Sequence, residues 1–513
     1  MIMLRPHRTF SLFSLFSLFL LALLALAQAD NHESACVQIC DESQPPRHRV
    51  CSCEARTQII RCAYHKLTTA NICLPPNLKS ANFIFDKLVL TENSISTLNK
   101  FEIFPERSNQ LIQLDLSRNI IDRLSDKVFE NLPNLLELDL GENIISQIEP
   151  EAFAGLYMLN SLDLHNNKIS DLSSNPFIQL RNSLRYLYLN QNPLVRLDNQ
   201  TFNRLHRLVY LSLDHTMLEV VHPDWFHGLV SLRTLSLKNN KFLTVPPLTG
   251  LVKLETLYLN GNPFSEIDQK SFYGLSKLET LYLSHLPQLW SIDFCAFCGL
   301  QYLKKLDMQC CPNLAYFHSE AFGPPENRLI KGMELFDVRN GSLSTLGSHM
   351  LPWHNITLLH LAGNPWNCDC QLRWVHALRK KIDPKLDAVF VCASPPHLAK
   401  HRLQEIKVSD MVCPMAMSSA SRVFIACVFG VLITGSSIFV WYLYCGRSRL
   451  PGTGNRCCAI FSNPGGKLPK YAYRNLALHS DIDEVKLVET APPDNSSSPT
   501  ADPNKLAPPP VNL

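Results

Sequence analysis

Hydrophobic residues recur along most of this chain with a period close to 24 residues. Residues 111–124 read LIQLDLSRNIIDRL, residues 135–148 read LLELDLGENIISQI, and residues 159–172 read LNSLDLHNNKISDL. The shared template is L-x-x-L-x-L-x-x-N-x-I/L-x-x-L, and it starts near residues 85, 111, 135, 159, 184, 208, 232, 254, 278, 303, 333 and 356. A fixed period of this length indicates a stack of about twelve structural repeats.

The template predicts one short strand followed by a buried turn in each repeat. Leu138 and Leu140 are spaced by two, so both side chains lie on the same side of a strand. A single repeat cannot bury these leucines, whereas stacked repeats form a continuous core. An asparagine amide suits the turn, because it can bond backbone groups of its own coil and of the adjacent coil. The asparagines at this position are Asn119, Asn143, Asn167, Asn192, Asn240 and Asn262.

A column of phenylalanines follows about eighteen residues after most repeat starts and is expected to fill the convex side. Its members are Phe129, Phe153, Phe177, Phe202, Phe226 and Phe272. The predicted fold class is an α/β repeat solenoid, curved into a horseshoe, with a parallel sheet on the concave face. The template resembles the leucine-rich repeat, and the resemblance covers residues 83–363.

The repeat pattern weakens in its last third. The asparagine position holds Thr216, Leu286, Cys311 and Gly341, the seventh repeat is short and lacks its phenylalanine, and the tenth is long. The tenth carries Pro324 and Pro325, so we expect a change of curvature and a protruding loop there.

Two long apolar runs lie outside the repeats. Phe10 to Ala27 follows basic residues and ends in Ala27-Gln28-Ala29, which is typical of a signal peptide over residues 1–29. An uncleaved N-terminal anchor is the alternative. Val423 to Tyr444 is uncharged and would span roughly 33 Å as a helix, enough to cross a bilayer.

Arginines cluster after the second run, at Arg447, Arg449 and Arg456. The positive-inside rule therefore predicts a single-pass type I protein of the plasma membrane with an extracellular N-terminus. Residues 415–422 would be a stalk, residues 423–444 the transmembrane helix, and residues 445–513 a cytoplasmic tail that is disordered in its acidic, Pro- and Ser-rich part. The small pair Gly430 and Thr434 lies within the span.

Cysteines flank the repeats on both sides. Residues 30–82 form a cysteine-rich N-terminal cap with Cys36, Cys40, Cys51, Cys53, Cys62 and Cys73. Residues 364–414 contain Cys368, Cys370, Cys392 and Cys413. This second segment resembles the C-terminal cap of extracellular leucine-rich repeat proteins, and the resemblance implies disulfides from Cys368 to Cys392 and from Cys370 to Cys413. The pairing in the N-terminal cap stays open.

Four further cysteines lie inside the repeats: Cys295, Cys298, Cys310 and Cys311. Their spacing is compatible with a zinc site, but a secreted segment favours disulfides. We expect such bridges to join the ninth and tenth repeats. On the predicted inner side of the membrane, Cys445, Cys457 and Cys458 are candidates for palmitoylation.

Composition excludes several classes of protein. The chain has 513 residues, is 46% hydrophobic and carries a net charge of +3, so it gives no indication of a nucleic-acid partner. We find no catalytic motif and expect no enzyme activity, no cofactor and no metal.

The concave face is the candidate binding surface, formed by residues two, four and six after each repeat start. The fourth position holds Asp115, Asp139 and Asp163, then Tyr188, Tyr258 and Tyr282; Tyr186 and Tyr210 join them from the second position. An acidic stripe is thus expected to lead into an aromatic patch that binds a protein partner. The aspartates are interpreted as a solvated stripe and not as a catalytic cleft.

Three sequons predict N-linked glycans at Asn199, Asn340 and Asn355. The chain ends in Pro510-Val511-Asn512-Leu513, which is compatible with a PDZ domain as partner. The resemblance and the membrane span together indicate a cell-surface receptor or adhesion molecule that binds an extracellular or cell-surface protein, either a second copy or a different molecule. The alternative is an auxiliary subunit that modulates a channel or another receptor in the same membrane.

Overall fold

A computed structural model describes residues 37–39, 50–54, 56–63, 66–74, 84–100, 102–104, 107–202, 204–327, 329–330, 332–378, 390–413 and 419–447. The chain divides into two compact units, Met1–Met415 and Ala416–Leu513. The predicted signal peptide, Cys36, Cys40, Cys457, Cys458 and the tail beyond residue 447 lie outside the described residues.

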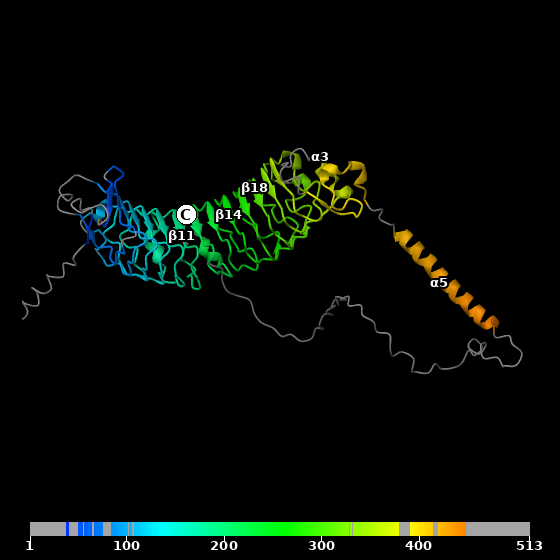
Figure 1. The fold of residues 1–513 in the computed structure, drawn as a ribbon, viewed down its shortest axis with the longest axis horizontal. Helices are drawn as coiled ribbons and strands as arrows, with labels where there is room; N and C mark the ends of the chain where they lie inside the picture. The colour runs from blue at the N-terminus through cyan, green and yellow to red at the C-terminus, as the bar shows by residue number, and fades with distance from the viewer. Residues whose placement is uncertain are drawn as a thin grey trace, which may run out of the picture. The chain divides into compact units, whose positions relative to one another are not determined.

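The first unit contains a sheet of fourteen strands among its described residues, with one strand at each of the twelve repeat starts (Figure 1). Its strands follow chain order: β2 (Ser52–Glu54), β3 (Ile59–Arg61), β5 (Lys87–Val89), β6 (Gln113–Asp115), β8 (Glu137–Asp139), β10 (Ser161–Asp163), β11 (Tyr186–Tyr188), β12 (Tyr210–Ser212), β13 (Thr234–Ser236), β14 (Thr256–Tyr258), β16 (Thr280–Tyr282), β18 (Lys305–Asp307), β20 (Leu335–Asp337) and β21 (Leu358–His360). The strands from β3 onward pair in parallel, which confirms the predicted solenoid.

Short elements complete the coils on the other side of the solenoid. They include β7 (Arg123–Leu124) with β9 (Gln147–Ile148), and β15 (Glu266–Ile267) with β17 (Ser291–Ile292) and β19 (Tyr316–Phe317). The 3-10 turns are η1 (Ser108–Gln110), η2 (Pro176–Leu180), η3 (Pro223–Phe226), η4 (Pro325–Asn327), η5 (Trp353–Asn355), η6 (Cys370–Leu372), η7 (Leu403–Glu405) and η8 (Val408–Asp410).

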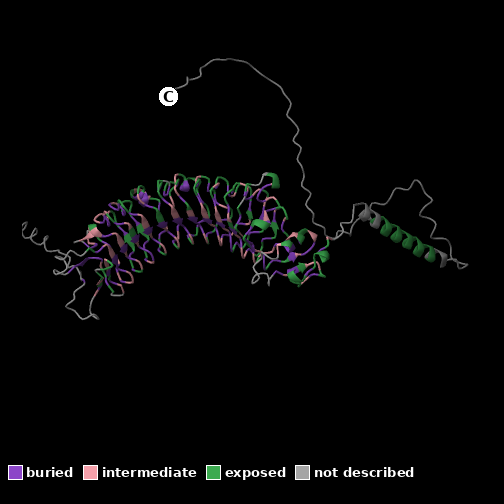
Figure 2. Ribbon diagram, turned by 90° about the horizontal axis from the view of Figure 1, so that it is seen from above, coloured by how far each residue is buried: buried purple, intermediate pink, exposed green. Residues whose placement is uncertain are grey.

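The repeat leucines form the core because the strand register aligns them. Leu138 pairs with Leu114 on one side and with Leu162 on the other, and all three are almost completely buried. Figure 2 shows buried residues recurring from coil to coil along the arc. Stacking of identical residues from coil to coil turns a short local pattern into one continuous core.

The phenylalanine column is buried as well and its rings stack between coils. Ring centroids lie 6.2 Å apart for Phe129–Phe153 and 6.0 Å apart for Phe153–Phe177. In the short seventh repeat, which has no phenylalanine at the column position, Leu248 and Leu251 are buried instead.

The asparagine ladder joins each coil to its neighbour. The Nδ2 of Asn143 donates to the carbonyls of Leu116, at 3.0 Å, and Leu140, at 3.1 Å, and its Oδ1 accepts from the backbone N–H of Ile121 at 3.1 Å. Because these groups are buried, the amide satisfies backbone donors and acceptors that no water can reach.

The residue before each ladder position adopts a left-handed backbone. These residues are Glu92, Arg118, Glu142, Asn166, Gln191, His215, Asn239, Gly261, His285, Cys310, Asn340 and Gly363. At Gly261, with φ of 69°, a β-carbon would overlap the side-chain amide of Asn239 in the preceding coil. Glycine therefore meets both a steric and a conformational requirement at this turn.

Where asparagine is absent, other groups take over its bonds. The hydroxyl of Thr216 donates to the Leu213 carbonyl at 2.8 Å and to Oδ1 of Asn240 at 2.9 Å. Cys311 is fully buried, and its Sγ donates to the Leu283 carbonyl at 3.3 Å. The ladder thus weakens in the last third without leaving a gap in the core.

The expected disulfide forms for Cys295 and Cys298, but the prediction that bridges join the ninth and tenth repeats is wrong. Cys295 pairs with Cys298 within one turn, whereas Cys310 and Cys311 are free thiols. The reason is geometric: Cys311 points inward at the ladder position, and Cys310 lies on the left-handed turn beside it, 3.8 Å from Nδ2 of Asn340.

Disulfide-bonded caps close both ends of the solenoid. In the N-terminal cap Cys51 pairs with Cys62, Cys53 and Cys73 are also disulfide-bonded, and β1 (Val37–Gln38) pairs with β4 (Ile72–Cys73). The antiparallel β2–β3 pair covers the first parallel strand and so protects an otherwise open sheet edge.

The C-terminal cap has disulfides Cys368–Cys392 and Cys370–Cys413, the two pairs that the resemblance implied. It contains β22 (Trp366–Asn367), β23 (Cys392–Ser394) and α3 (Arg373–Ala377). Trp366 is fully buried, stacks on Phe390 at 5.5 Å and donates its indole N–H to the Leu361 carbonyl of the last coil. The indole therefore covers leucines that no further repeat would bury.

The second unit contains one long helix, α5 (Ser419–Arg447). Its segment Ala426–Leu443 is long and apolar enough to cross a membrane, judged by length and composition. The Thr434 hydroxyl donates to the Gly430 carbonyl within the helix, at 2.9 Å, and so needs no external partner.

Candidate binding face

One column of side chains runs across the concave sheet at the fourth residue after each repeat start. Strand register places its members side by side in the order Val89, Asp115, Asp139, Asp163, Tyr188, Ser212, Ser236, Tyr258, Tyr282, Asp307, Asp337 and His360. Tyr186 and Tyr210 are paired in the adjacent column, from β11 and β12. All eight candidate binding residues predicted from the sequence thus lie on one face, in two neighbouring columns.

The three aspartates are half-buried and bonded to the backbone, so they differ from the freely solvated stripe expected from the sequence. Oδ1 of Asp115 accepts the Ser117 N–H at 3.0 Å, Oδ1 of Asp139 the Gly141 N–H at 2.9 Å, and Oδ1 of Asp163 the His165 N–H at 2.8 Å. Each carboxylate therefore caps the end of its own strand and retains a second oxygen for another donor.

Burial raises the pKa of Asp139 to about 6, although the bond from the Gly141 N–H lowers it. The neighbouring carboxylates Asp163 and Asp115 add to the increase because they repel a third negative charge. The ionised form of Asp139 is thus insufficiently compensated by the groups around it, and a cation placed beside it would be stabilised.

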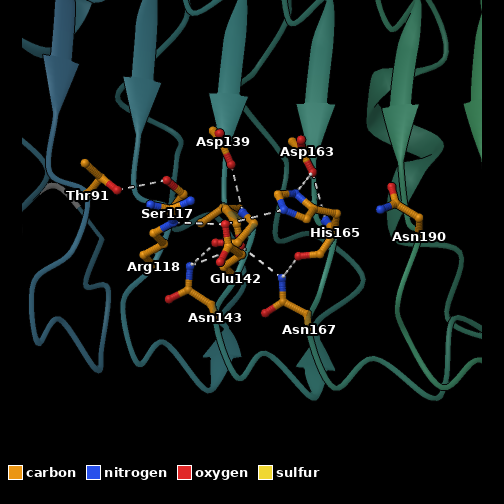
Figure 3. A network of polar contacts seen from close by, with 12 residues as sticks. Thr91, Ser117, Arg118, Asp139, Glu142, Asn143, Asp163, His165, Asn167 and Asn190 are labelled. Atoms are coloured by element: carbon orange, nitrogen blue, oxygen red, sulfur yellow. Dashed lines mark hydrogen bonds and ion pairs between the residues drawn. The ribbon is translucent and has the colours of Figure 1, made fainter. Parts of the chain in front are cut away.

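His165 connects this column to the turn edge of the sheet (Figure 3). Its Nδ1 lies 2.7 Å from Oδ1 of Asp163 and its Nε2 lies 3.8 Å from Oε1 of Glu142. The hydrogen bond with Asp163 is the main reason why the pKa of His165 is raised. Arg118 bridges two acids along the same edge, with 2.8 Å to Oε1 of Glu92 and 2.9 Å to Oε1 of Glu142.

Asp139, Asp163 and His165 could together reach one cation, since their ligand atoms lie within 4.8 Å of one another. Each already bonds a protein group: Asp139 accepts from Gly141, and Asp163 pairs with His165. The arrangement is therefore explained by contacts within the protein, and it does not by itself indicate a metal.

Four tyrosines form two ring pairs further along the face. The centroids of Tyr188 and Tyr210 lie 5.0 Å apart in a tilted arrangement, and those of Tyr258 and Tyr282 lie 4.5 Å apart with planes within 2°. The predicted aromatic patch is thus two pairs, separated in the column by Ser212 and Ser236. Burial is the main reason why the pKa values of Tyr188, Tyr210 and Tyr258 are raised.

A lysine lies on the second ring pair. Nζ of Lys238 is 4.3 Å from the Tyr258 ring centroid and 3.9 Å from Oδ2 of Asp214, and the Lys238 N–H donates to Oδ1 of Asp214 at 2.7 Å. A ring face and a carboxylate therefore hold an ammonium group between them on this surface.

The C-terminal end of the column is electrostatically satisfied. Asp337 is buried, forms a 2.6 Å ion pair with Nη2 of Arg339 and lies 3.0 Å from Nδ1 of His360. Because these partners surround the carboxylate, this end of the face is suited to holding the coils together.

Sequence reasoning missed His165, Lys238 and Asp214, which lie at the sixth residue after their repeat starts. The sequence places that position on the concave face. The signal was available, because a histidine follows Asp163 by two residues, and an aspartate and a lysine occupy the same position in adjacent repeats.

The three sequon asparagines are all exposed. Asn340 lies on the left-handed turn after β20, at the C-terminal end of the concave face, whereas Asn199 and Asn355 lie outside the concave strands. The concave strands that carry the acidic and aromatic residues, from Asp115 to Tyr282, contain no sequon.

A cavity of about 460 Å³ lies away from this face, at the junction of the last repeats and the C-terminal cap. Its lining includes Pro325, His349, Trp353 and Trp374. The two indoles stack at 4.6 Å. Pro325 belongs to the insertion in the tenth repeat, and the change of curvature predicted there stays a prediction.

The family model described as "Leucine rich repeat" matches residues 109–169, 182–242 and 252–312, and the model described as "Leucine Rich repeats (2 copies)" matches residues 230–273. These matches fall on the coils that carry the acidic column and the tyrosine pairs.

Two curated relatives are similar to part of this chain. Chaoptin of Drosophila melanogaster is 29% identical over 240 residues, which cover 47% of this chain and 16% of chaoptin. The CD180 antigen of Mus musculus is 27% identical over 238 residues, which cover 44% of this chain and 30% of the antigen. The matched part spans less than a third of the length of either relative.

A chain of the mouse RP105/MD-1 complex has a similar solved structure, with a TM-score of 0.50 and 25% identity. The similarity covers 70% of this chain and 54% of that chain.

Proposed function

Because this chain is a leucine-rich repeat protein, we propose that it is a cell-surface receptor or adhesion molecule that binds a protein partner through its concave face, without catalysis. The observation that carries the proposal is the presence of two tyrosine ring pairs beside the acidic column. Tyrosine supplies a large rigid contact area with few rotatable bonds, so it loses little conformational freedom on binding.

The rings are preorganised by their neighbours. Tyr258 is held between Tyr282 and the ammonium of Lys238, and Tyr188 is held against Tyr210. A surface whose anchors are already ordered gives up less entropy when a partner docks, which favours affinity.

The comparisons support binding as the general role. One similar chain comes from a structure whose title names a complex of RP105 with MD-1. The aspartates, the other candidate chemistry, are each used as a backbone acceptor at a strand end, which supports an interface in preference to a catalytic centre.

Helix α5 supports a location in the plasma membrane. A single-pass type I arrangement would expose the solenoid outside the cell, where the disulfides Cys368–Cys392 and Cys370–Cys413 are stable. An epitope tag inserted after Asp30 should then be detected on intact cells, and a tag at Leu513 only after permeabilisation.

A cell-clustering assay tests the function. Non-adherent cells that express the full-length chain are mixed with labelled control cells. If the chain binds a second copy, expressing cells cluster with one another only, and Tyr188→Leu with Tyr258→Leu disperses the clusters. Tyr157→Leu with Tyr273→Leu is the matched control, because these tyrosines are each 74% exposed and lie on loops outside the concave strands.

If expressing cells do not cluster, the partner is a different protein, and the same cells are used to screen a library of surface proteins. A captured partner must bind the Tyr157→Leu, Tyr273→Leu control variant and fail to bind the Tyr188→Leu, Tyr258→Leu variant. Partners that bind both tyrosine variants equally well would refute the concave face as the binding site.

A further inference from the structure

The acidic part of the concave face has a charge opposite to that of the whole chain. We consider the repeats that start at residues 111, 135 and 159, and in each the second, fourth, sixth and seventh residue after the start. These positions hold five acids and one arginine, so their net charge is −4 with His165 neutral. The whole chain carries +3. The acids are Asp115, Glu137, Asp139, Glu142 and Asp163, and Arg118 is already bonded to Glu92 and Glu142.

The structure also shows how this face holds a cation. Lys238 places its ammonium between the Tyr258 ring and the Asp214 carboxylate. Asp163 and Tyr188 are direct neighbours in strand register, with strands spaced about 4.8 Å apart, and they offer the same combination of carboxylate and ring. Among the described residues, no lysine or arginine contacts the ring of Tyr188 or Tyr210.

We propose that the partner presents a cationic segment whose arginine side chains lie over Tyr188 and Tyr210 and beside Asp163 and Asp139. The inference rests on the proposed binding function and specifies the chemistry of the partner. Arginine fits better than lysine, because a planar guanidinium stacks on a ring and still directs N–H groups to a carboxylate.

The test uses the full-length chain in micelles of an uncharged detergent and three fluorescein-labelled peptides of equal length, (Arg-Gly)6, (Lys-Gly)6 and (Glu-Gly)6. Fluorescence anisotropy measures binding at low salt and at about 0.5 M salt, where exposed charges are screened. We expect the arginine peptide to bind most tightly, the lysine peptide less tightly and the glutamate peptide not at all, and high salt to weaken binding.

The variants locate the site. Asp139→Asn with Asp163→Asn should weaken arginine-peptide binding about tenfold, as two partly buried ion pairs predict. Asparagine keeps the Oδ1 that accepts the strand-end N–H, so the fold should be unaffected, which circular dichroism checks. Tyr188→Leu with Tyr210→Leu should also weaken binding, whereas the control Glu149→Gln with Glu266→Gln, which removes the same charge from exposed positions outside the concave strands, should not.

Equal binding of the arginine and glutamate peptides, or unchanged binding to the Asp139 and Asp163 variant, would overturn the inference. The proposed function is decided separately, by the tyrosine variants in the cell assay. A partner that is lost in those variants but is insensitive to salt and to the aspartate variants would keep the function and refute the cationic segment. If (Arg-Gly)6 disperses clusters of expressing cells, a second copy supplies that segment.

Discussion

The imidazole of His165 occupies the space that a β-carbon on Gly141 would need. Gly141 has no left-handed backbone that would require glycine. Glycine is needed there because it is small: without a β-carbon on Gly141, the His165 ring of the next coil has room to place Nδ1 2.7 Å from Oδ1 of Asp163. One glycine thus determines how the acidic column is connected to the turn edge.

Gly141→Ala should displace His165 and lower the free energy of unfolding by about 1–3 kcal/mol, the usual range for overpacking. Urea unfolding of the purified chain, followed by circular dichroism, measures the change. In a His165→Ala background the same substitution should be nearly neutral, because the added methyl group then has room. An equal loss in both backgrounds would show that the effect does not pass through the imidazole.

Two groups of this network make stability depend on pH in the same direction. The pKa of Asp139 is raised from the ordinary value of 3.8 to about 6, so the folded state binds this proton more tightly than the unfolded state. Its contribution is complete below about pH 4 and is lost as the pH rises through 6. The pKa of His165 is raised above 6.5, so its contribution is complete below that pH and is lost as the pH rises through the folded value. Stability should therefore fall from about pH 4 to about pH 6 through Asp139, and fall further above pH 6.5 through His165.

Asp139→Asn should remove the part of the pH dependence of stability that lies below about pH 6. It should also raise the free energy of unfolding at pH 7.5 by about 1 kcal/mol, after allowance for solvent screening. Urea midpoints measured every half pH unit give the slope. Glu149→Gln is the control, since this exposed glutamate lies outside the network. A slope unchanged by Asp139→Asn would assign the pH dependence to other groups.

The positions of the strands could be predicted from the sequence, because they depend on local spacing. Strands β5 to β21 of the concave sheet begin two residues after the twelve predicted starts, since the paired leucines of each repeat must face the core. Which residues share the concave face followed from the same alternation.

Contacts between side chains of different repeats could not be predicted in this way. The stacking of Tyr258 on Tyr282 and the position of Lys238 over the ring depend on rotamers that the repeat leaves undetermined. The free thiols were missed for a similar reason: an even number of cysteines says which bridges are numerically allowed, but not that Cys311 points into the core.

The asparagine ladder should contribute more to stability than the residues that replace it. Asn167 donates to the Leu140 and Leu164 carbonyls at 3.0 and 3.1 Å and accepts the Ile145 N–H at 2.9 Å. Asn167→Ala leaves these buried groups without partners and should cost about 3 kcal/mol.

Cys311→Ala removes one weak sulfur donor and a small volume, and should cost only about 1 kcal/mol. Urea unfolding of both variants compares the two positions, with the exposed neighbour Lys168→Ala as a control. Equal costs at Asn167 and Cys311 would show that the amide bonds add nothing beyond packing.

The two adjacent thiols should differ in reactivity. Burial raises the pKa of Cys311 to about 12 and excludes reagents, whereas Cys310 is partly exposed. On intact cells a membrane-impermeant maleimide should label wild type, and Cys310→Ser should remove that labelling; Cys311→Ser should leave it unchanged. If Cys310→Ser does not alter the labelling, the thiol is paired or inaccessible on the cell surface.

A glycan placed on the concave face should block the partner, because a branched oligosaccharide is larger than any side chain it replaces. Tyr186→Asn with Tyr188→Thr creates a sequon on β11, where Tyr186 is 37% exposed. Added mass on a gel, removed by a glycosidase, confirms the modification. Clustering or partner binding should then be lost and should not return to wild type after glycosidase treatment, because the tyrosines are also absent.

The converse variant separates obstruction from misfolding. Asn199→Gln removes a natural sequon outside the concave strands, so it should lower the mass without changing binding. A second sequon variant with all four paired tyrosines intact, Ser161→Asn with Asp163→Thr, tests the acidic end, and glycosidase treatment there should restore the contact made by the tyrosines. If binding persists with a glycan at residue 186 or 161, the partner does not approach the concave face.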